Sequence, residues 1–325
     1  MNFDYAIAET LEDAFQARRN EARWFAGGTD LIPEIKSGIA APTRLVNLKG
    51  IDGLHGIVVQ DDAVQIGALT KLAEIAEHET IRTSYRALAQ ACELAASPQI
   101  RNMATIGGNL NQDSRCPYYR NGFPCFLHGG DTCFMREGEN REAAIVGYKD
   151  CVHVHPSDPA TALVAFDAQI VVQSQDGERV ISAREFFRAP DAQDRRMSVL
   201  EDDEVITAIR LPRISPNARS AFVKAMDRAV WSFALASAAV RVEIENERVN
   251  DARVVLGGIA PTPWREIGIE RALLGTGVSS DGWSNEELNQ LAANALADAQ
   301  PLAHNRYKVR LARAMMKRAL RDCLG

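Results

Sequence analysis

Four of the six cysteines in the chain fall inside one irregular stretch, and this clustering constrains the fold more than any other feature of the sequence. The stretch follows a Gly-Gly-Asn turn, is punctuated by glycine and proline, and contains Cys116, Cys125, Cys133 and Cys151. Four thiolates that converge from an irregular loop suit a [4Fe-4S] cluster, because iron favours soft sulfur ligands and flexible backbone can wrap a cube. We therefore expect this loop to fold around a metal centre.

Other occupants of the four cysteines stay open at this point. Zinc could use the same ligands, although the paired Cys-x2-Cys spacing common in structural zinc sites is missing. Two disulfides, or four unrelated buried thiols, would need an oxidising compartment or coincidence. The nearby His128, His153 and His155 are candidate replacement ligands, but a loop histidine is more often solvated or hydrogen-bonded. Cys92, in an alanine-rich helical stretch, is expected to be a buried structural thiol.

Length and composition predict a soluble protein of two or three domains. The chain has 325 residues, 46% of them hydrophobic and 25% charged, and no run approaches the roughly 20 apolar residues that cross a bilayer. The net charge of -6 argues against nonspecific nucleic-acid binding. Basic residues recur at helical spacing in residues 306–325, which predicts an amphipathic helix.

The N-terminal sequence MNFDYAIAETLEDAF lacks the basic start and apolar core of an export signal. We therefore expect the chain to fold in the cytoplasm. A periplasmic destination would depend on a signal carried by a partner subunit.

Periodicity along the chain predicts three units. Residues 1–55 show helix, strand, helix and strand over 10–19, 22–28, 29–38 and 43–50. Residues 56–213 form a larger α+β unit, with strands expected at 56–68, 169–173, 179–182 and 205–212 and helices at 70–78, 82–96 and 158–166. Residues 213–220 are the best linker candidate. The last unit, 219–325, is expected to hold a small antiparallel sheet followed by three helices.

Two glycine turns are candidate anion sites. The first, at residues 25–31, joins a strand to a helix for which Thr29 is the expected N-cap, leaving backbone N–H groups free to face a pyrophosphate. The second, at residues 105–109, repeats the pattern of hydroxyl, paired glycines and amide. Neither matches the Gly-x-Gly-x-x-Gly of a Rossmann unit or a Walker P-loop. Ordinary tight turns are the alternative, but two such turns favour a nucleotide site of another architecture.

Four segments together closely resemble the flavin-binding medium subunit of the molybdenum hydroxylases, the xanthine dehydrogenase family: AGGTDLIPEIK, QIRNMATIGGNL, HPSD and FVKAMDRAVWSFALAS. A cysteine-bearing insertion at about residues 112–155 resembles the loops of two branches of this family, periplasmic aldehyde oxidoreductase and 4-hydroxybenzoyl-CoA reductase. The run NREAAIVG before the last cysteine and HPSD is more similar to the aldehyde oxidoreductase loop. The insertion is therefore identified as a [4Fe-4S] loop.

This resemblance implies an α+β flavoprotein of the vanillyl-alcohol-oxidase (PCMH) type, with two α/β subdomains that bind FAD and a C-terminal α+β domain. It implies that the FAD pyrophosphate is bound by Ala26, Gly27, Gly28, Thr29, Asp30, Leu31, Thr105, Gly107, Gly108 and Asn109. Asp158 matches an acidic residue near the ribose or ribityl hydroxyls, although it could instead cap helix 158–166. Lys224 matches a lysine near the flavin ring, where positive charge would stabilise the reduced anion. Asp227-Arg228 stands where the family usually has two arginines.

The resemblance also implies an oxidoreductase subunit that transfers electrons. A large molybdopterin subunit would oxidise aldehydes to carboxylic acids, and a small subunit with two [2Fe-2S] clusters would pass electrons through FAD to an external acceptor. The alternatives are a 4-hydroxybenzoyl-CoA reductase-like or xanthine dehydrogenase-like enzyme and, in a different class, a zinc-stabilised nucleotide-binding module.

Two groups of carboxylates resemble catalytic pairs but fall in turns between expected strands. They are Asp61 with Asp62, and Asp202 with Asp203 and Glu204. We expect these groups to be solvated and assign them no chemistry.

Overall fold

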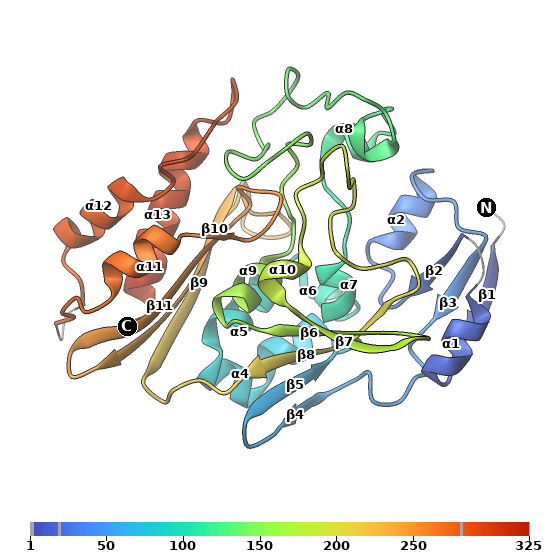
Figure 1. The fold of residues 1–325 in the computed structure, drawn as a ribbon, viewed down its shortest axis with the longest axis horizontal. Helices are drawn as coiled ribbons and strands as arrows, with labels where there is room; N and C mark the ends of the chain where they lie inside the picture. The colour runs from blue at the N-terminus through green and yellow to red at the C-terminus, as the bar shows by residue number, and fades with distance from the viewer. Residues whose placement is uncertain (1–2, 19–20, 280–281, 325) are drawn as a thin grey trace.

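The computed structural model describes residues 3–18, 21–279 and 282–324, and in these residues the strands form three sheets (Figure 1). The first sheet is parallel, in the order β1-β3-β2, and consists of β1 (Asp4–Ile7), β2 (Ala22–Phe25) and β3 (Arg44–Asn47). Helices α1 (Leu11–Ala17) and α2 (Leu31–Lys36) connect its strands. The sequence analysis missed β1, because its residues are mostly exposed and carry no clear apolar alternation.

The second sheet is antiparallel, in the order β4-β5-β8-β6-β7. Its strands are β4 (Ile57–Val59), β5 (Ala63–Gly67), β6 (Gln169–Ser174), β7 (Gly177–Ser182) and β8 (Val205–Pro212). Helices α3 (Leu72–Glu77), α4 (Glu79–Ser84), α5 (Arg86–Leu94) and α9 (Asp158–Ala165) bury their apolar residues in one core with this sheet.

The single helix expected over residues 82–96 is wrong, because the chain breaks at Tyr85 between α4 and α5. Tyr85 has φ -117° and ψ 47°, outside the helical region. Its ring packs edge-on against Phe166 at 5.2 Å, and its hydroxyl donates to the carbonyl oxygen of Pro212 at 2.9 Å. These tertiary contacts outweigh the continuous helical pattern of the sequence.

The third sheet is also antiparallel, in the order β12-β11-β10-β9. Its strands are β9 (Ala218–Ala225), β10 (Ala236–Glu245), β11 (Arg248–Gly257) and β12 (Trp264–Arg265). The C-terminal helices α11 (Ile267–Leu273), α12 (Asn285–Asn294) and α13 (Tyr307–Asp322) pack on this sheet, and α5 and α9 also contact its strands. The amphipathic helix predicted at the C-terminus is confirmed as α13, which buries Ala312, Met316 and Leu320. The mixture of sheets and helices confirms the α+β class.

The described residues contain no helix that is long and apolar enough to cross a membrane. The predicted domain boundaries at residues 55, 213 and 219 stay predictions. The expected linker is shorter than predicted, because β9 already begins at Ala218.

The cysteine loop, residues 112–155, is mostly irregular backbone, as expected. It contains two short helical turns, α8 (Pro117–Arg120) and η1 (Phe126–His128), and lies between α2 and α13 at the top of Figure 1. Its second half is bound to the C-terminal unit, since the Ile145 amide donates to Ile259 and the His155 amide to Ala260. Three further short helices are α6 (Pro98–Arg101), α7 (Ile106–Leu110) and α10 (Ala183–Phe186).

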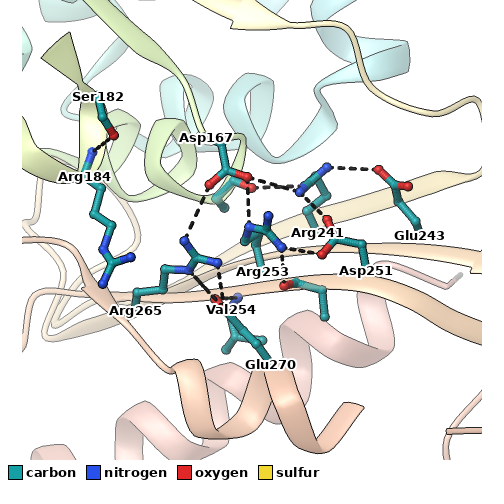
Figure 2. A network of polar contacts seen from close by, with 12 residues as sticks. Asp167, Ser182, Arg184, Arg241, Glu243, Asp251, Arg253, Val254, Arg265 and Glu270 are labelled. Carbon is teal, nitrogen blue, oxygen red and sulfur yellow. Dashed lines mark hydrogen bonds and ion pairs between the residues drawn. The ribbon is translucent and has the colours of Figure 1, made fainter. Parts of the chain in front are cut away.

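An ionic network joins the second and third sheet units (Figure 2). Asp167, which follows α9 with a positive φ of 51°, places its carboxylate 2.8 Å from Arg253, 3.4 Å from Arg241 and 3.6 Å from Arg265. Arg241 is buried and also pairs with Asp251 at 2.8 Å. Because three cationic side chains from β10, β11 and β12 meet one carboxylate beside α9, this network fixes the third sheet against the second unit.

Candidate functional site

The first glycine turn presents a row of unused backbone donors. In the described structure, the N–H groups from Gly27 through Leu31 donate to no protein acceptor. Gly28 has φ +69°, which glycine adopts without strain. The residue that precedes α2 is Asp30, so the expected Thr29 cap is wrong, and Asp30 makes no side-chain cap bond. Adjacent free N–H groups on a tight turn can bind an anion without any charged side chain.

The second glycine turn is built differently, and the expectation that it also offers free N–H groups is wrong. Thr105 caps α7, because its Oγ1 accepts from the Gly108 amide at 3.3 Å. The Gly107 amide donates to the Ala68 carbonyl at 2.9 Å. The amides of this turn are therefore used to hold its own shape, and the turn contributes a glycine surface rather than a row of donors.

The two turns meet and line one cavity of about 150 Å³, called cavity A here. Gly27 packs so tightly that a Cβ at this position would overlap the carbonyl oxygen of Met103, just before the second turn. The candidate residues that line cavity A are Ala26, Gly27, Gly28, Thr29, Asp30, Leu31, Thr105, Gly107 and Gly108. Residues about 80 positions apart in the sequence thus share one wall, as the sequence analysis expected.

Cavity B is larger, about 730 Å³, and shares Thr29, Asp30 and Gly108 with cavity A. Its walls come from the second sheet unit and from the loop between β9 and β10. Apolar side chains line it, including Leu72 and Phe233, together with a smaller number of polar side chains. An elongated ligand that begins at the glycine turns can therefore continue into a mostly apolar cavity.

Asp158 and Lys224, both predicted to act near the flavin, are paired with each other. Lys224 Nζ donates to Asp158 Oδ2 at 2.7 Å and to the Leu94 carbonyl at 3.1 Å. Burial raises the pKa of Asp158, and the Lys224 ammonium opposes that rise. Asp158 lines cavity B. The alternative role of Asp158 as a helix cap is wrong, because Ser157 Oγ accepts from the Ala160 amide and caps α9.

Asn109 and Ser157 connect the second turn to this ion pair. Ser157 Oγ donates to Asn109 Oδ1 at 2.5 Å, and Asn109 lines cavity B. The hydrogen bond aligns the end of α7 with the start of α9.

The four loop cysteines are free thiols, and three of them interact closely. The hydrogen bond from Cys151 lowers the pKa of Cys133 to about 6, and the same contact raises the pKa of Cys151. Burial raises the pKa of Cys116 to about 11, with a smaller electrostatic effect from Cys133 and Cys125. The structure shows no disulfide among these residues. Cys92 is fully buried in the core, as expected for a structural thiol.

In the described residues, no three His, Cys, Asp or Glu side chains are arranged to hold a single metal ion. A mononuclear zinc site needs its ligands to converge on one point at about 2.0–2.3 Å. A cluster instead spreads its cysteine ligands over different iron atoms. The interacting but unconverged thiols are compatible with the cluster geometry.

Two of the loop histidines are buried rather than solvated. His153 and His155 are 1% and 7% exposed, and burial lowers the pKa of His153 to about 4 and that of His155 to about 3. His153 Nδ1 contacts the Val154 carbonyl, whereas the Nε2 atoms of both rings have no partner in the described protein. His128 remains a loop histidine on the surface, with Nδ1 2.7 Å from the Phe123 carbonyl.

The unpartnered Nε2 atoms belong to residues that line cavity C, a space of about 50 Å³. Ser237, whose Oγ also lacks a partner, lines the same cavity, together with Cys116 and Asp158. Cavity C therefore lies between a cysteine of the loop and a residue of cavity B.

The sequence analysis missed a group of charged residues that connects the first glycine turn to the cysteine loop. Arg115 Nη1 and Arg120 Nη2 lie 2.5 and 3.0 Å from Asp30 Oδ1. The signal available in the sequence was the pair of arginines that flank Cys116, but spacing does not reveal their partner. Similarly, Asp227 pairs with Arg141 of the loop at 3.0 Å, which balances its charge.

The carboxylates that were expected to be solvated divide into two groups. Asp61, Asp62, Asp202 and Asp203 are exposed. Glu204 is buried, which contradicts the expectation, because Arg179 from the neighbouring strand β7 holds its Oε2 at 2.6 Å. Glu204 also lines cavity A.

Comparison with known proteins decides the family. Residues 1–214 match the FAD binding domain in molybdopterin dehydrogenase, and residues 221–323 match the CO dehydrogenase flavoprotein C-terminal domain. The chain belongs to the FAD-binding subunits of the molybdenum hydroxylases. It is an oxidoreductase subunit, as the sequence analysis expected.

Relatives of this FAD-binding subunit cover nearly its whole length. The aldehyde oxidoreductase FAD-binding subunit PaoB of Escherichia coli (strain K12) is 34% identical over 98% of each chain. The carbon monoxide dehydrogenase medium chain of Hydrogenophaga pseudoflava is 28% identical over 93% of this chain and 88% of its own. A solved structure of carbon monoxide dehydrogenase from Hydrogenophaga pseudoflava superposes with a TM-score of 0.77 at 26% identity, covering 99% of this chain and 97% of the other.

The residues present fit FAD in this FAD-binding subunit. The free N–H groups of the first turn suit the two phosphates, and the missing Cβ atoms of Gly27 and Gly28 allow a close approach of the ligand. Cavity B offers the apolar walls that a flavin ring needs, with Asp158 and Asn109 as polar groups.

Proposed function

We propose that this chain is the FAD- and [4Fe-4S]-containing electron-transfer subunit of an aldehyde oxidoreductase. The observation that carries the proposal is the position of the cysteine loop, whose Cys116 shares cavity C with Asp158 of cavity B. A cluster on the loop would thus be separated from the flavin by one small cavity. Support for the substrate class comes from the 34% identity to an aldehyde oxidoreductase FAD-binding subunit.

In this proposal the backbone donors of the first turn neutralise the phosphates, and Thr105 keeps the second turn in shape through its bond to Gly108. Asp158 would accept hydrogen bonds from ligand hydroxyls, with its charge balanced by Lys224. FAD, when bound, supplies the conversion between single-electron and two-electron transfer. The walls of cavity B exclude water from the reacting ring.

The proposed cluster ligands are Cys116, Cys125, Cys133 and Cys151. The pKa of Cys133 is already lowered to about 6, so this thiol gives up its proton readily on metal binding. Arginine and backbone donors around the loop would compensate the charge of the thiolates.

The proposed partners are a large subunit that carries molybdopterin and a small subunit that carries two [2Fe-2S] clusters. Electrons would leave aldehydes at molybdenum, pass through the small subunit, and reach an external acceptor through this chain. A periplasmic location by export together with a signal-bearing partner remains part of the proposal.

The decisive experiment is a visible spectrum of the anaerobically purified chain, with flavin, iron and sulfide quantified on the same sample. About one FAD with four iron and four sulfide is expected. Flavin without iron would overturn the cluster assignment and leave the flavin assignment standing. One zinc ion in place of iron would identify the loop as a structural zinc site.

Replacement of single cysteines tests the ligand set. Cys133→Ser is expected to abolish the iron content while some FAD remains, because it removes a thiol that interacts with Cys151. Cys92→Ala is the matched control, since Cys92 is buried in the core away from the loop. Retention of four iron atoms in Cys133→Ser would remove this residue from the proposed ligands.

Family membership contradicts the alternative of a nucleotide-binding module without a redox role. Among the family members, a 4-hydroxybenzoyl-CoA reductase-like or xanthine dehydrogenase-like enzyme is the second candidate, and relatives include a nicotinate dehydrogenase FAD-subunit. Assay of the assembled enzyme with aldehydes, aromatic thioesters and purines separates these candidates. Turnover of only thioesters or purines would contradict the aldehyde assignment.

A further inference from the structure

The side chain of Asp30 connects the first glycine turn to the cysteine loop. Asp30 immediately precedes α2, but its carboxylate turns away from that helix end and forms no cap. Oδ2 accepts from the Asp113 amide at 2.9 Å, and Oδ1 lies 2.5 Å from Arg115 and 3.0 Å from Arg120. One residue of the phosphate-binding turn thus has three partners in the loop.

Arg120 makes this connection stiff because its guanidinium bridges two turns of α2. Nη2 pairs with Asp30, and Nη1 lies 2.9 Å from Glu34 Oε1, while Nε donates to the Ser114 carbonyl at 2.7 Å. A planar guanidinium with several donors in fixed directions holds its partners more rigidly than an ammonium does. The geometry of α2 therefore depends on the conformation of residues 113–120.

The surroundings favour a strong interaction. The side chains of Asp30, Arg115 and Arg120 are 17–25% exposed, and Glu34 is 2% exposed. Such partly buried pairs are screened less by salt than exposed ones. Burial also raises the pKa of Glu34 to about 8, so near neutral pH Glu34 is mostly neutral and Asp30 is the main anionic partner of Arg120.

Arg115 and Arg120 flank Cys116, a proposed cluster ligand. Binding of a cluster to Cys116 restricts the same segment whose arginines hold Asp30. Arg120 itself is not part of the lining of cavity A or cavity B, so it can influence a ligand there only through Asp30, Glu34 and the backbone.

We propose that the cysteine loop and the dinucleotide site bind their cofactors cooperatively, with Arg120 as the positioning residue that transmits the coupling through Asp30. An occupied cysteine loop holds the first glycine turn in its binding conformation and so raises FAD affinity. By thermodynamic reciprocity, bound FAD raises the affinity of the loop for its cluster by the same factor. The inference rests on the proposed function, because it requires a cluster on the loop cysteines.

The test measures the dissociation constant of FAD by flavin fluorescence on the full chain, with the cluster present and after its removal by a chelator under anaerobic conditions. Cluster removal is expected to weaken FAD binding about tenfold, equivalent to about 1.4 kcal/mol. Arg120→Gln is expected to weaken FAD binding similarly in the cluster-loaded protein. In this variant the further effect of cluster removal should fall below about twofold.

Two further variants keep the test independent of misfolding. Arg120→Lys retains the charge but cannot bridge Asp30 and Glu34 in the same way, so an intermediate FAD affinity is expected. Arg318→Gln is the matched control, since Arg318 is 66% exposed and pairs only with Asp322 at 3.4 Å on the surface of α13. It should leave both the FAD affinity and its dependence on the cluster unchanged.

The outcomes separate this inference from the proposed function. Iron in the wild-type chain combined with an FAD affinity that ignores cluster removal would overturn the coupling alone. A cluster effect that stays tenfold in Arg120→Gln would overturn the role of Arg120. Absence of iron from the anaerobic wild-type chain would overturn the cluster assignment and the coupling together.

Discussion

Lys224 Nζ lies 2.7 Å from Asp158 Oδ2, and both side chains are almost fully buried, at 1% and 5% exposure. Lys224 belongs to β9 and Asp158 begins α9, so their ion pair joins the third sheet to the second unit beside cavity B. The resemblance implied that the lysine charge acts on the flavin directly. The structure instead makes Lys224 a positioning residue for Asp158, because its charge is already balanced.

Lys224→Met is expected to destabilise the fold by about 3–5 kcal/mol, because it leaves the buried carboxylate of Asp158 without its cation. Urea unfolding measures the change. Lys71→Met is the control, since Lys71 is exposed and lies 3.9 Å from Glu74, a pair worth at most about 1 kcal/mol. A loss below about 1 kcal/mol for Lys224→Met would show that Asp158 finds another partner.

Gly27→Ala is expected to weaken FAD binding more than about tenfold, because the new Cβ would overlap the Met103 carbonyl and push the two glycine turns apart. Gly268→Ala introduces the same methyl group in α11, where no atom lies within 4 Å of it. Titration of the apoprotein with FAD compares the two variants. Equal affinities would mean that the contact between the turns does not shape the site.

Lys308 gives the stability a dependence on alkaline pH. Burial lowers its pKa to about 7, from the ordinary value of about 10.5, and Nζ donates to the carbonyls of Glu142 and Ala143. Between these pH values the unfolded chain binds this proton more strongly than the folded chain does. The contribution of Lys308 to stability therefore rises with pH in this window, by up to about 1.4 kcal/mol per unit.

Lys308→Met should remove this contribution. The free energy of unfolding, measured from pH 7 to pH 10 in both proteins, is expected to rise less, or fall more, in the variant than in the wild type. Parallel pH profiles would show that Lys308 keeps an ordinary pKa in the folded chain.

Asp167→Ala removes the carboxylate shared by Arg241, Arg253 and Arg265 (Figure 2). We expect a loss of about 1–2 kcal/mol, because Arg241 and Arg253 keep Asp251 and Arg265 keeps Glu270. Thermal unfolding should show a smaller difference from the wild type at high salt, since Asp167 is 40% exposed and is screened. Asp176→Ala, in an exposed turn, is the control; an equal effect there would exclude the network as the cause.

Local features were predictable from the sequence because they depend on neighbouring residues. Strand β8 was predicted at residues 205–212, where the structure has it, because its apolar run is bounded by turn signals. The long helix at residues 82–96 failed, because a break at Tyr85 depends on Phe166 and Pro212, which lie far away in the chain. β1 failed for a related reason: it is held by pairing with β3 rather than by its own pattern.

The sequence by itself determined the family, the position of the cysteine loop and the two glycine turns, because each is written in contiguous residue types and spacings. Only the tertiary structure decided which amides of those turns stay free, that Lys224 neutralises Asp158, and that Asp30 faces Arg120. The physical reason is competition among hydrogen-bond partners. A buried polar group is satisfied by whichever partner the packing of distant segments brings within reach, and sequence spacing does not specify that partner.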